Sequence, residues 1–458
     1  MKIMMISCNV ASTPYSVYPL GMGMVANALL QAGHEVVQYD YLYSDMSIPG
    51  LEEKIDKFRP DLFGISIRNI DNHVMLQEKW YIDAAKDIVQ AIRRKSDSRV
   101  VLGGSGYSIM PETILQEVGA DYGICGEGEE KMLELVSAIE NSNPPAQRCL
   151  YASNTLSGSR IPSAKYDDEL MQFYLKNGTI ATIQTKRGCP HKCVYCAYPS
   201  IEGKVYRPRD PGHIVDDIEH LLQYHGAEYI FFTDSVFNDD EGHFMDVVRE
   251  MDKRDISTPW TAFFKPSNLS AEQIELMKKT GLVGVELGAD AATDRTLKKM
   301  GKSFSMQEVK KYNELFNYYN VATAHYFMFG GPGETRETVE EGIENILNMT
   351  DTVSFINMGI RIAPNTAMEQ IAIREGVISE EENLLHPKYY ISPEVDPEWL
   401  EQRLTRAFTG ISNCVFPIDS LDSTLQFLHR LGYKGSLWEM LIPDENKQKK
   451  RKRRQRNA

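Results

Sequence analysis

Residues 188–196 read Gly188-Cys189-Pro190-His191-Lys192-Cys193-Val194-Tyr195-Cys196. Three of the seven cysteines of the chain lie in this stretch, with the spacing C-x3-C-x2-C. Thiolates are soft ligands suited to iron–sulfur clusters, and a closed cluster takes four of them. The next cysteine is Cys414, and His191 stands too close to Cys189 and Cys193 to bind the same cluster. The stretch therefore predicts a cluster held by three cysteines with one metal position open, as in a catalytic site. A zinc loop with a distant fourth ligand is the alternative.

Outward from this loop, residues 179–375 alternate short apolar runs with helical segments. The strands expected in this region are 180–186, 229–234, 261–265, 283–289, 322–329 and 353–362. Six βα units are fewer than the eight of a closed barrel, so we expect a partial (β/α)6 barrel. Residues 376–446 read as a small, mostly helical C-terminal region, in which Leu400, Leu404 and Phe408 have the spacing of a packed helix. Cys414 reads as buried and inert.

The N-terminal 140 residues form a second βα series. The strands expected here are 2–9, 35–40, 62–68, 99–104 and 122–126, and helices are expected to begin near Gly21, Gly50, Met75, Pro111 and Glu129. Several strands are continuously apolar, which indicates helices on both faces of a doubly wound, Rossmann-like α/β sheet. Ligands of such sheets lie beyond the carboxyl ends of the strands. Residues 141–178 are rich in Ser, Asn, Gly and Pro and read as a linker.

Composition is that of a soluble globular protein, with 42% hydrophobic and 25% charged residues. No signal peptide or membrane span is recognised, so we expect a cytoplasmic protein. The net charge of −14 argues against a nucleic-acid partner. Residues 447–458 are strongly basic, however, and we expect a disordered tail there. Peripheral contact of this tail with anionic lipid headgroups is an alternative to a solvated tail.

The cysteine loop resembles the signature of radical S-adenosylmethionine (SAM) enzymes, C-x3-C-x-φ-C, with Tyr195 as the aromatic residue. The resemblance implies a [4Fe–4S] cluster on Cys189, Cys193 and Cys196, SAM at its open iron, and reductive cleavage of SAM to a 5′-deoxyadenosyl radical. It also implies an external electron donor of the flavodoxin or ferredoxin type. The SAM contacts that it implies are Tyr195, Asp234, Ser235, Glu286, Gly330, Gly331 and Glu334.

Three of these assignments have alternatives. The Gly-Gly-Glu element usual in the family is absent, and Asp234 and Ser235 stand in its place. Glu286 lies in an otherwise apolar strand, where a buried ion pair would also explain it. Residues 330–335 also read as an ordinary βα turn with Glu334 at a helix start.

The order of the two domains resembles the cobalamin-binding radical SAM class. The cobalamin contacts that this resemblance implies are Gly21, Ser66, Asn69, Gly103, Gly104, Gly126 and Glu127. A nucleotide-binding Rossmann domain is the alternative, but no G-x-G-x-x-G follows the first strand. Asp71-Asn72-His73 begins like the D-x-H-x-x-G of histidine-ligated corrinoid proteins, yet Leu76 replaces the glycine. We therefore expect cobalamin without a histidine ligand from His73.

Within this class, the chain resembles a branch associated with lipid biosynthesis, including ladderane-type gene sets. Residues 64–72, 184–189, 234–238 and 359–362 are the segments that resemble it. The branch implies a lipid-type or other small-molecule substrate, with Arg361 as a candidate for its phosphate or carboxylate. A salt bridge from Arg361 to a neighbouring acid is equally compatible with the sequence.

C-methylation of an unactivated carbon is the reaction expected from this class. Cobalamin-assisted ring formation or rearrangement stays open, as does a non-enzymatic corrinoid or iron–sulfur carrier. A tRNA methylthiotransferase-like activity would use Cys8, Cys125 and Cys149 for a second cluster. We read these three cysteines as structural thiols, because two of them fall in apolar strands or strand ends and the third in the linker.

Overall fold

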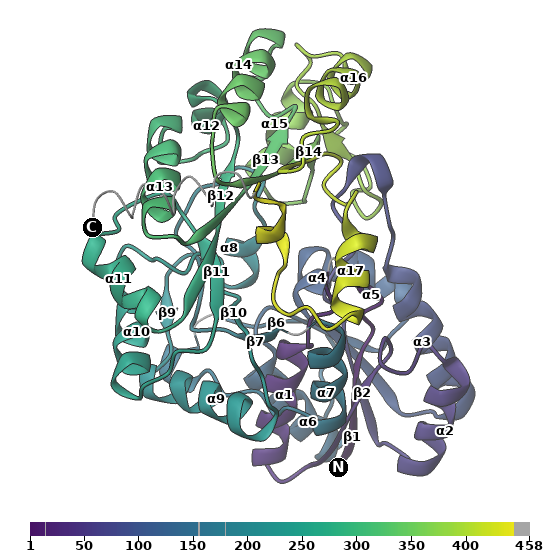
Figure 1. The fold of residues 1–458 in the computed structure, drawn as a ribbon. Helices are drawn as coiled ribbons and strands as arrows, with labels where there is room; N and C mark the ends of the chain where they lie inside the picture. The colour runs from purple at the N-terminus through teal and green to yellow at the C-terminus, as the bar shows by residue number, and fades with distance from the viewer. Residues whose placement is uncertain (14, 154–155, 179, 444–458) are drawn as a thin grey trace.

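The computed structural model describes residues 1–13, 15–153, 156–178 and 180–443. The basic tail expected at residues 447–458 lies outside these residues. Figure 1 shows an N-terminal α/β domain packed against a larger α/β domain, with the last described segment lying between them. Within the described residues, no helix has the length and apolar character needed to cross a membrane.

The first domain is built on a fully parallel sheet of six strands. In spatial order the strands are β2 (Glu35–Asp40), β1 (Lys2–Ser7), β3 (Leu62–Ser66), β4 (Arg99–Gly103), β5 (Tyr122–Cys125) and β6 (Cys149–Tyr151). Five of them match the predicted strands. The sixth, β6, falls within the predicted linker, where it pairs with β5 and extends the sheet.

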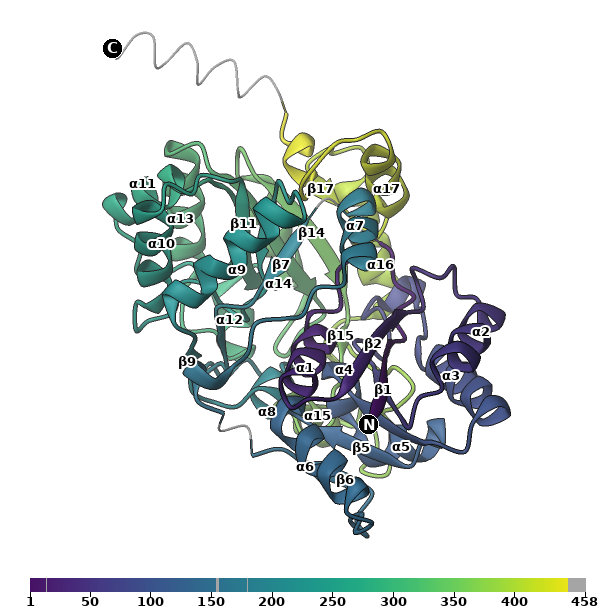
Figure 2. The ribbon, with the colours of Figure 1, turned by 90° about the horizontal axis from the view of Figure 1, so that it is seen from below.

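Helices cover both faces of this sheet, as the continuously apolar strands predict. They are α1 (Leu20–Gln31), α2 (Ile48–Phe58), α3 (Ile82–Lys95), α4 (Ser105–Ile109), α5 (Pro111–Val118) and α6 (Gly128–Glu140). Helices α2, α3 and α5 pack on one face, and α1 and α6 pack on the other, which faces the second domain (Figure 2). The helix expected to start near Met75 begins only at Ile82, as α3. Met75–Gln77 form a 3₁₀ turn, η1, and Asn72 holds the loop between the two through hydrogen bonds with Gln77 and Lys79.

The second domain has a parallel sheet of seven strands. In spatial order these are β7 (Ala181–Ile183), β10 (Ile230–Phe232), β11 (Trp260–Phe264), β12 (Leu282–Asp290), β13 (Ala322–Phe329), β14 (Val353–Met358) and β17 (Cys414–Val415). The first six confirm the predicted partial barrel. The edge strand β17 was not predicted, because a two-residue strand carries no periodicity of its own.

Most helices of the second domain pack on the outer face of its sheet (Figure 1), whereas the short helix at Tyr198–Ile201 packs against α4 of the first domain. The helices of the second domain are α8 (Tyr198–Ile201), α9 (Pro211–Tyr224), α10 (His243–Lys253), α11 (Ala271–Lys279), α12 (Asp294–Lys299), α13 (Met306–Tyr318), α14 (Arg336–Leu347) and α15 (Ala367–Arg374). Capping boxes begin α11 at Ser270 and α13 at Ser305, which explains why these helices start where they do. Two antiparallel pairs complete the domain: β8 (Lys186–Arg187) with β9 (Arg207–Pro208), and β15 (Ile360–Arg361) with β16 (Tyr389–Tyr390).

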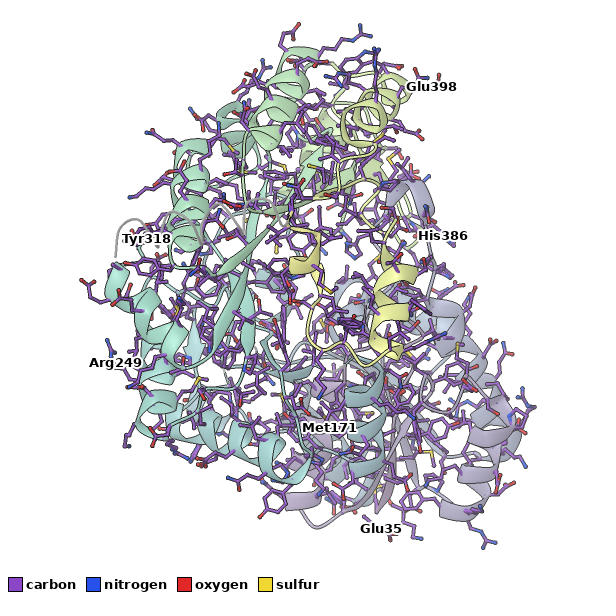
Figure 3. The ribbon with its side chains drawn as sticks, in the orientation of Figure 1. Glu35, Met171, Arg249, Tyr318, His386 and Glu398 are labelled. Atoms are coloured by element: carbon purple, nitrogen blue, oxygen red, sulfur yellow. The ribbon has the colours of Figure 1, made fainter. Side chains whose placement is uncertain are left out.

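Four further elements connect the domains or follow the barrel. They are η2 (Gly158–Arg160), α7 (Asp168–Asn177), α16 (Pro397–Phe408) and α17 (Asp422–Arg430), with a final 3₁₀ turn, η3 (Trp438–Leu441). Helix α7 lies in the predicted linker and joins the two cores: Met171 and Tyr174 are buried in the hydrophobic cluster that runs from α1 and α6 into the second sheet. In Figure 3, Met171 lies in this interior, whereas Arg249 and Tyr318 lie at the outer surface.

Candidate active site

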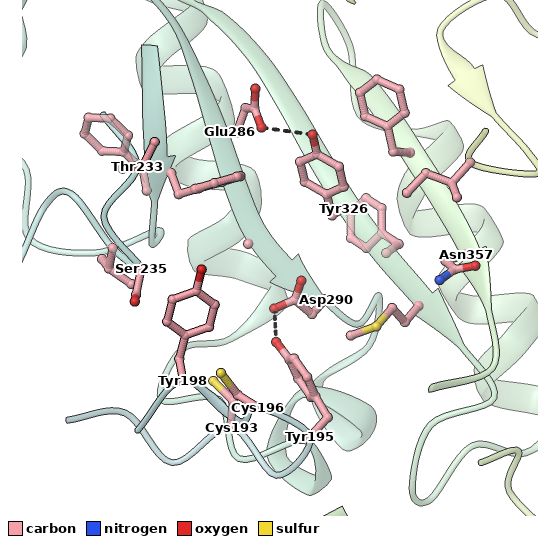
Figure 4. Close-up of a pocket in the computed structure, with 18 of the residues that line it drawn as sticks. Cys193, Tyr195, Cys196, Tyr198, Thr233, Ser235, Glu286, Asp290, Tyr326 and Asn357 are labelled. Carbon is pink, nitrogen blue, oxygen red and sulfur yellow. Dashed lines mark hydrogen bonds between the residues drawn. The ribbon is translucent and has the colours of Figure 1, made fainter. Parts of the chain in front are cut away.

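A cavity of about 930 Å³ lies where the two domains and the last described segment meet. Its walls come from the cysteine loop, the barrel strands, the loop after β3 of the first domain, and residues 418–438. Cys189, Cys193 and Cys196 all line it, and Figure 4 shows Cys193 and Cys196 beneath the strands that carry Glu286 and Tyr326. The three thiols predicted from spacing alone therefore face one shared space.

The cysteine loop is fixed by its backbone. Gly188 adopts a φ of +87°, and a Cβ there would lie 2.0 Å from the carbonyl oxygen of Val205, so no other residue fits without a shift. The amide of Cys189 donates to Gly203, and that of Val194 donates to Met300. These contacts hold the loop against the barrel. Among the described residues, no three His, Cys, Asp or Glu side chains converge on a single-ion site.

A buried cation lies beside the cysteine loop. Lys302 forms an ion pair with Asp290, and its ammonium group donates to the hydroxyl of Tyr195 at 3.1 Å and to the carbonyl of Gly288 at 3.2 Å. Burial opposes its charge, but Asp290 and Cys193 outweigh burial and raise the pKa of Lys302. A positive charge at this place favours the thiolate form of a neighbouring cysteine.

Sequence reasoning missed both Asp290 and Lys302. Asp290 lies at the carboxyl end of β12, four residues beyond Glu286, and lines the cavity beside Tyr195 (Figure 4). The position at a strand end was a signal that could have identified it, since ligands of such sheets lie beyond the strand ends. Lys302 follows α12 and no sequence pattern marks it.

Asp234 and Ser235, two predicted SAM contacts, differ in their surroundings. Both line the cavity, but the carboxylate of Asp234 accepts hydrogen bonds from Thr185 and from the ammonium group of Lys186 at 3.0 Å. Asp234 thus stabilises the start of the cysteine loop. The buried hydroxyl of Ser235 has no hydrogen-bond partner among the described residues, which leaves it available to a ligand.

Glu286 is almost fully buried in the wall of the cavity, at 1% exposure. Its carboxyl group accepts hydrogen bonds from the hydroxyl of Tyr326 at 2.9 Å and from the indole of Trp438 at 3.2 Å (Figure 4 shows the first). Burial raises the pKa of Glu286 to about 7, and the two hydrogen bonds only partly oppose this shift. The alternative explanation of this buried acid was an ion pair, but Glu286 forms none with the described residues.

This raised pKa predicts a pH-dependent stability. The carboxyl of Glu286 binds its proton more tightly in the folded chain than in the unfolded chain, so its contribution to stability is fully present below about pH 4.5. Stability is lost as the pH rises to about 7, by about 3 kcal/mol in total. Glu286→Gln should remove this loss, and urea unfolding at pH 5 and pH 8 measures it. Glu334 has a similarly raised pKa, so the difference between the variant and the unaltered chain isolates Glu286. An unchanged pH dependence in the variant would contradict the assignment.

The loop after β13 carries three of the predicted SAM contacts but does not line the cavity. Gly330, Gly331 and Glu334 are absent from its lining. The carboxyl of Glu334 instead accepts hydrogen bonds from the amide of Gly330 at 3.1 Å and from Thr338 at 2.7 Å. These hydrogen bonds close the loop on itself, and contact of Gly330, Gly331 and Glu334 with SAM stays an untested prediction.

A smaller cavity of about 310 Å³ lies at the carboxyl ends of the first sheet. Its lining includes six of the seven predicted cobalamin positions: Gly21, Ser66, Gly103, Gly104, Gly126 and Glu127. The seventh, Asn69, lines the large cavity. A Cβ on Gly21 would meet nothing within 4 Å, and one on Gly103 would approach only the carbonyl oxygen of Ile124, at 3.8 Å. These glycines leave open space for a ligand. Arg68, which the predictions did not single out, lines both cavities.

Two buried ion-pair groups join the domains on either side of these cavities. At the first, Glu127 pairs with Arg207 at 2.8 Å and with Arg187 at 3.0 Å, and Arg187 also pairs with Glu129. The predicted cobalamin contact Glu127 is therefore already occupied by two guanidinium groups. Its carboxylate holds the first sheet against the strand pair that leads into the cysteine loop.

At the second group, Arg361 pairs with Asp71 at 3.0 Å, and both side chains are buried. Arg361 also donates to the carbonyl groups of Ile362 and Leu384, and it does not line either cavity. The fold thus contains the salt bridge that was the alternative for Arg361, and a substrate contact of Arg361 stays an untested prediction. His73 likewise lines neither cavity.

Cys8, Cys125 and Cys149 have structural partners. The thiol of Cys8 donates to Ser66, that of Cys125 donates to Ser108, and Cys149 lies 3.6 Å from the hydroxyl of Tyr107. Burial raises the pKa of Cys8 to about 12. These contacts agree with structural thiols.

Comparison with known proteins assigns both domains. Residues 183–346 match the model of the radical SAM superfamily, and residues 6–136 match that of the B12 binding domain. The chain is therefore a radical SAM enzyme with an N-terminal B12-binding domain. The [4Fe–4S] cluster, SAM and cobalamin predicted from the sequence are confirmed as its cofactors.

Several characterised proteins are similar over most of the chain. Tryptophan 2-C-methyltransferase of Streptomyces laurentii is 24% identical, covering 76% of this chain and 70% of its own. The structure of TsrM, a radical SAM methyltransferase from Kitasatospora setae with tryptophan substrate and a SAM analogue bound, has a TM-score of 0.82 at 22% identity, and the match covers 100% of both chains. An anaerobic magnesium-protoporphyrin IX monomethyl ester cyclase of Rubrivivax gelatinosus is 26% identical, covering 70% of this chain and 60% of its own. These similarities do not support the predicted lipid-biosynthesis branch.

Proposed function

We propose that this enzyme is a cobalamin-dependent methyltransferase that moves a methyl group from SAM to a carbon of a small-molecule substrate. The observation that carries the proposal is the single large cavity that contains both the cysteine loop and the loop after β3 of the B12-binding domain. A substrate in this space would lie between the two cofactors. The name of the similar tryptophan methyltransferase supports methyl transfer, and the cyclase name supports ring formation as the second candidate.

The residues of this chain have separate tasks in the proposal. Cys189, Cys193 and Cys196 hold the cluster, Ser235 offers its free hydroxyl to SAM, and Gly21 and Gly103 leave room for cobalamin. When bound, the cluster supplies the electron that cleaves SAM and cobalamin carries the methyl group. An external donor of the flavodoxin or ferredoxin type reduces the cluster.

The test is anaerobic turnover of the reconstituted enzyme with methyl-labelled SAM and a panel of small aromatic and aliphatic compounds. Methyl transfer places the label on one of these compounds and releases S-adenosylhomocysteine beside 5′-deoxyadenosine. Formation of 5′-deoxyadenosine with an unlabelled, cyclised product would instead support the second candidate. A protein that cleaves no SAM at all would contradict both.

A variant at Gly103 tests the role of the smaller cavity. Gly103→Leu fills open space at the carboxyl end of β4, so cobalamin content and label transfer should fall at least ~10-fold. Ser137→Leu adds the same bulk on the exposed face of α6 in the same domain and should change neither quantity. Full cobalamin content in Gly103→Leu would show that the cavity has another use.

A further inference from the structure

The last described segment of the chain, residues 416–443, closes one side of the large cavity. We call it the C-terminal segment. Asp419, Asp422 and Trp438 line the cavity from this segment, and Trp438 also donates to Glu286 of β12. The segment therefore contacts both the barrel and any molecule held in the cavity.

The carboxylate of Asp419 is the notable group of this segment. Each of its two oxygen atoms exposes less than 1 Å², and neither has a hydrogen-bond partner among the described residues. A buried carboxylate without donors costs several kcal/mol in proteins, because its hydration is lost without replacement. Such a group is expected where a ligand brings the missing donors.

Other acidic groups of the cavity have partners. Asp234 pairs with Lys186, Asp290 pairs with Lys302, and Glu286 accepts two hydrogen bonds. Asp422 is bound by the hydroxyl of Thr13 and lies in the field of Lys79, although burial raises the pKa of Asp422 and Asp419 adds to that rise. Arg68 lies at the boundary with the smaller cavity, which it also lines. Asp419, by contrast, has neither a hydrogen-bond donor nor an ion-pair partner for its carboxyl oxygens among the described residues.

Aromatic side chains line the same cavity, and Tyr326 and Phe355 pack in one hydrophobic cluster with Ile418, the residue before Asp419. Tyr15, Phe263, Tyr326, Phe355 and Trp438 line it, and the rings of Tyr326 and Phe355 are stacked at 5.2 Å. Aromatic faces attract cations as well as apolar groups, so they suit a molecule that has both. A free carboxylate beside such faces is complementary to a protonated amine on an apolar or aromatic body.

We propose that Asp419 binds a protonated amine of the substrate, so that the enzyme selects small molecules in which a cationic nitrogen is joined to an aromatic or apolar body. The inference rests on the proposed function in one respect only: it calls the molecule that binds to Asp419 the substrate. The binding preference itself concerns the cavity and is measurable without turnover.

The experiment measures binding of three probes of similar shape to the reconstituted enzyme by calorimetry. They are 2-phenylethylamine, which is cationic, 2-phenylethanol, which is neutral, and 3-phenylpropanoate, which is anionic. The amine should bind at least ~10-fold more tightly than the alcohol, and the anion most weakly. Asp419→Asn should abolish the preference for the amine over the alcohol while leaving the affinity for the alcohol within about threefold.

Ser420→Ala is the matched control, because Ser420 neighbours Asp419 but is exposed and should keep the preference. The unchanged affinity of Asp419→Asn for the alcohol shows that the variant is folded. Equal binding of amine and alcohol, failure of the amine to bind, or an unchanged preference in Asp419→Asn would each overturn the proposal. An enzyme that prefers the amine but transfers no methyl group would refute the proposed function and not this inference.

Discussion

Replacing Cys193 with alanine is expected to abolish cleavage of SAM. The cysteine loop offers three thiols to one cavity, so the loss of one leaves too few protein ligands to retain the cluster. Iron content should fall from about four atoms per chain to less than about one, and formation of 5′-deoxyadenosine should fall at least ~100-fold. Iron analysis and product chromatography after anaerobic reconstitution measure both quantities.

Cys125→Ser is the control for this prediction. The hydroxyl of serine can keep the hydrogen bond to Ser108, and Cys125 lines neither cavity. Iron content and activity should therefore stay at the level of the unaltered enzyme. A loss of about half the iron in Cys125→Ser would favour a second cluster and hence the methylthiotransferase-like alternative. Full SAM cleavage in Cys193→Ala would contradict the assignment of the loop.

Replacing Arg361 with methionine is expected to cause the largest loss of stability. The change leaves Asp71 as an unpaired charge at 1% exposure, and breaking a buried pair in this way costs about 3–5 kcal/mol. Urea unfolding measures the loss. Cobalamin content should fall as well, because Asp71 belongs to the same loop as Arg68, which lines the smaller cavity as well as the large one.

A double variant separates the unpaired charge from lost packing. Asp71→Asn in the Arg361→Met background removes the buried charge but retains an oxygen for the amide of His73, so about 1–3 kcal/mol should return. Arg403→Met breaks an exposed pair with Glu340 and should cost less than about 1 kcal/mol. If Arg361→Met and Arg403→Met lowered the free energy of unfolding equally, the claim that Arg361 joins the two domains would be refuted.

The position of the site along the chain followed from local sequence. The spacing of Cys189, Cys193 and Cys196 defines a set of ligands within one loop. Such a set can be recognised without knowing how the rest of the chain packs. Glycines after β4 and β5 likewise marked the smaller cavity, because in parallel sheets the ligand lies beyond the strand ends. Strands β2 and β13 matched their predicted bounds because their apolar runs end at polar or glycine residues.

Roles that depend on side-chain partners could not be predicted in the same way. Glu127 and Glu334 read as ligand contacts, yet the fold gives Glu127 two arginines and encloses Glu334 in its own turn. Arg361 finds Asp71 across 290 residues of sequence. Each of these side chains has the right chemistry for a ligand, and only its neighbours decide whether it is free.

The amino-acid sequence by itself determined the two α/β domains and the cysteine loop, since these depend on periodicity and spacing within short segments, and its resemblance to a known family supplied the cofactors. Only the tertiary structure decided that Asp290 and Lys302 lie beside the cysteine loop, and that Asp419 faces the cavity without a partner. The physical reason is that charge pairing and burial depend on contacts between segments that are distant in the chain. A local sequence pattern does not indicate which of these segments come into contact.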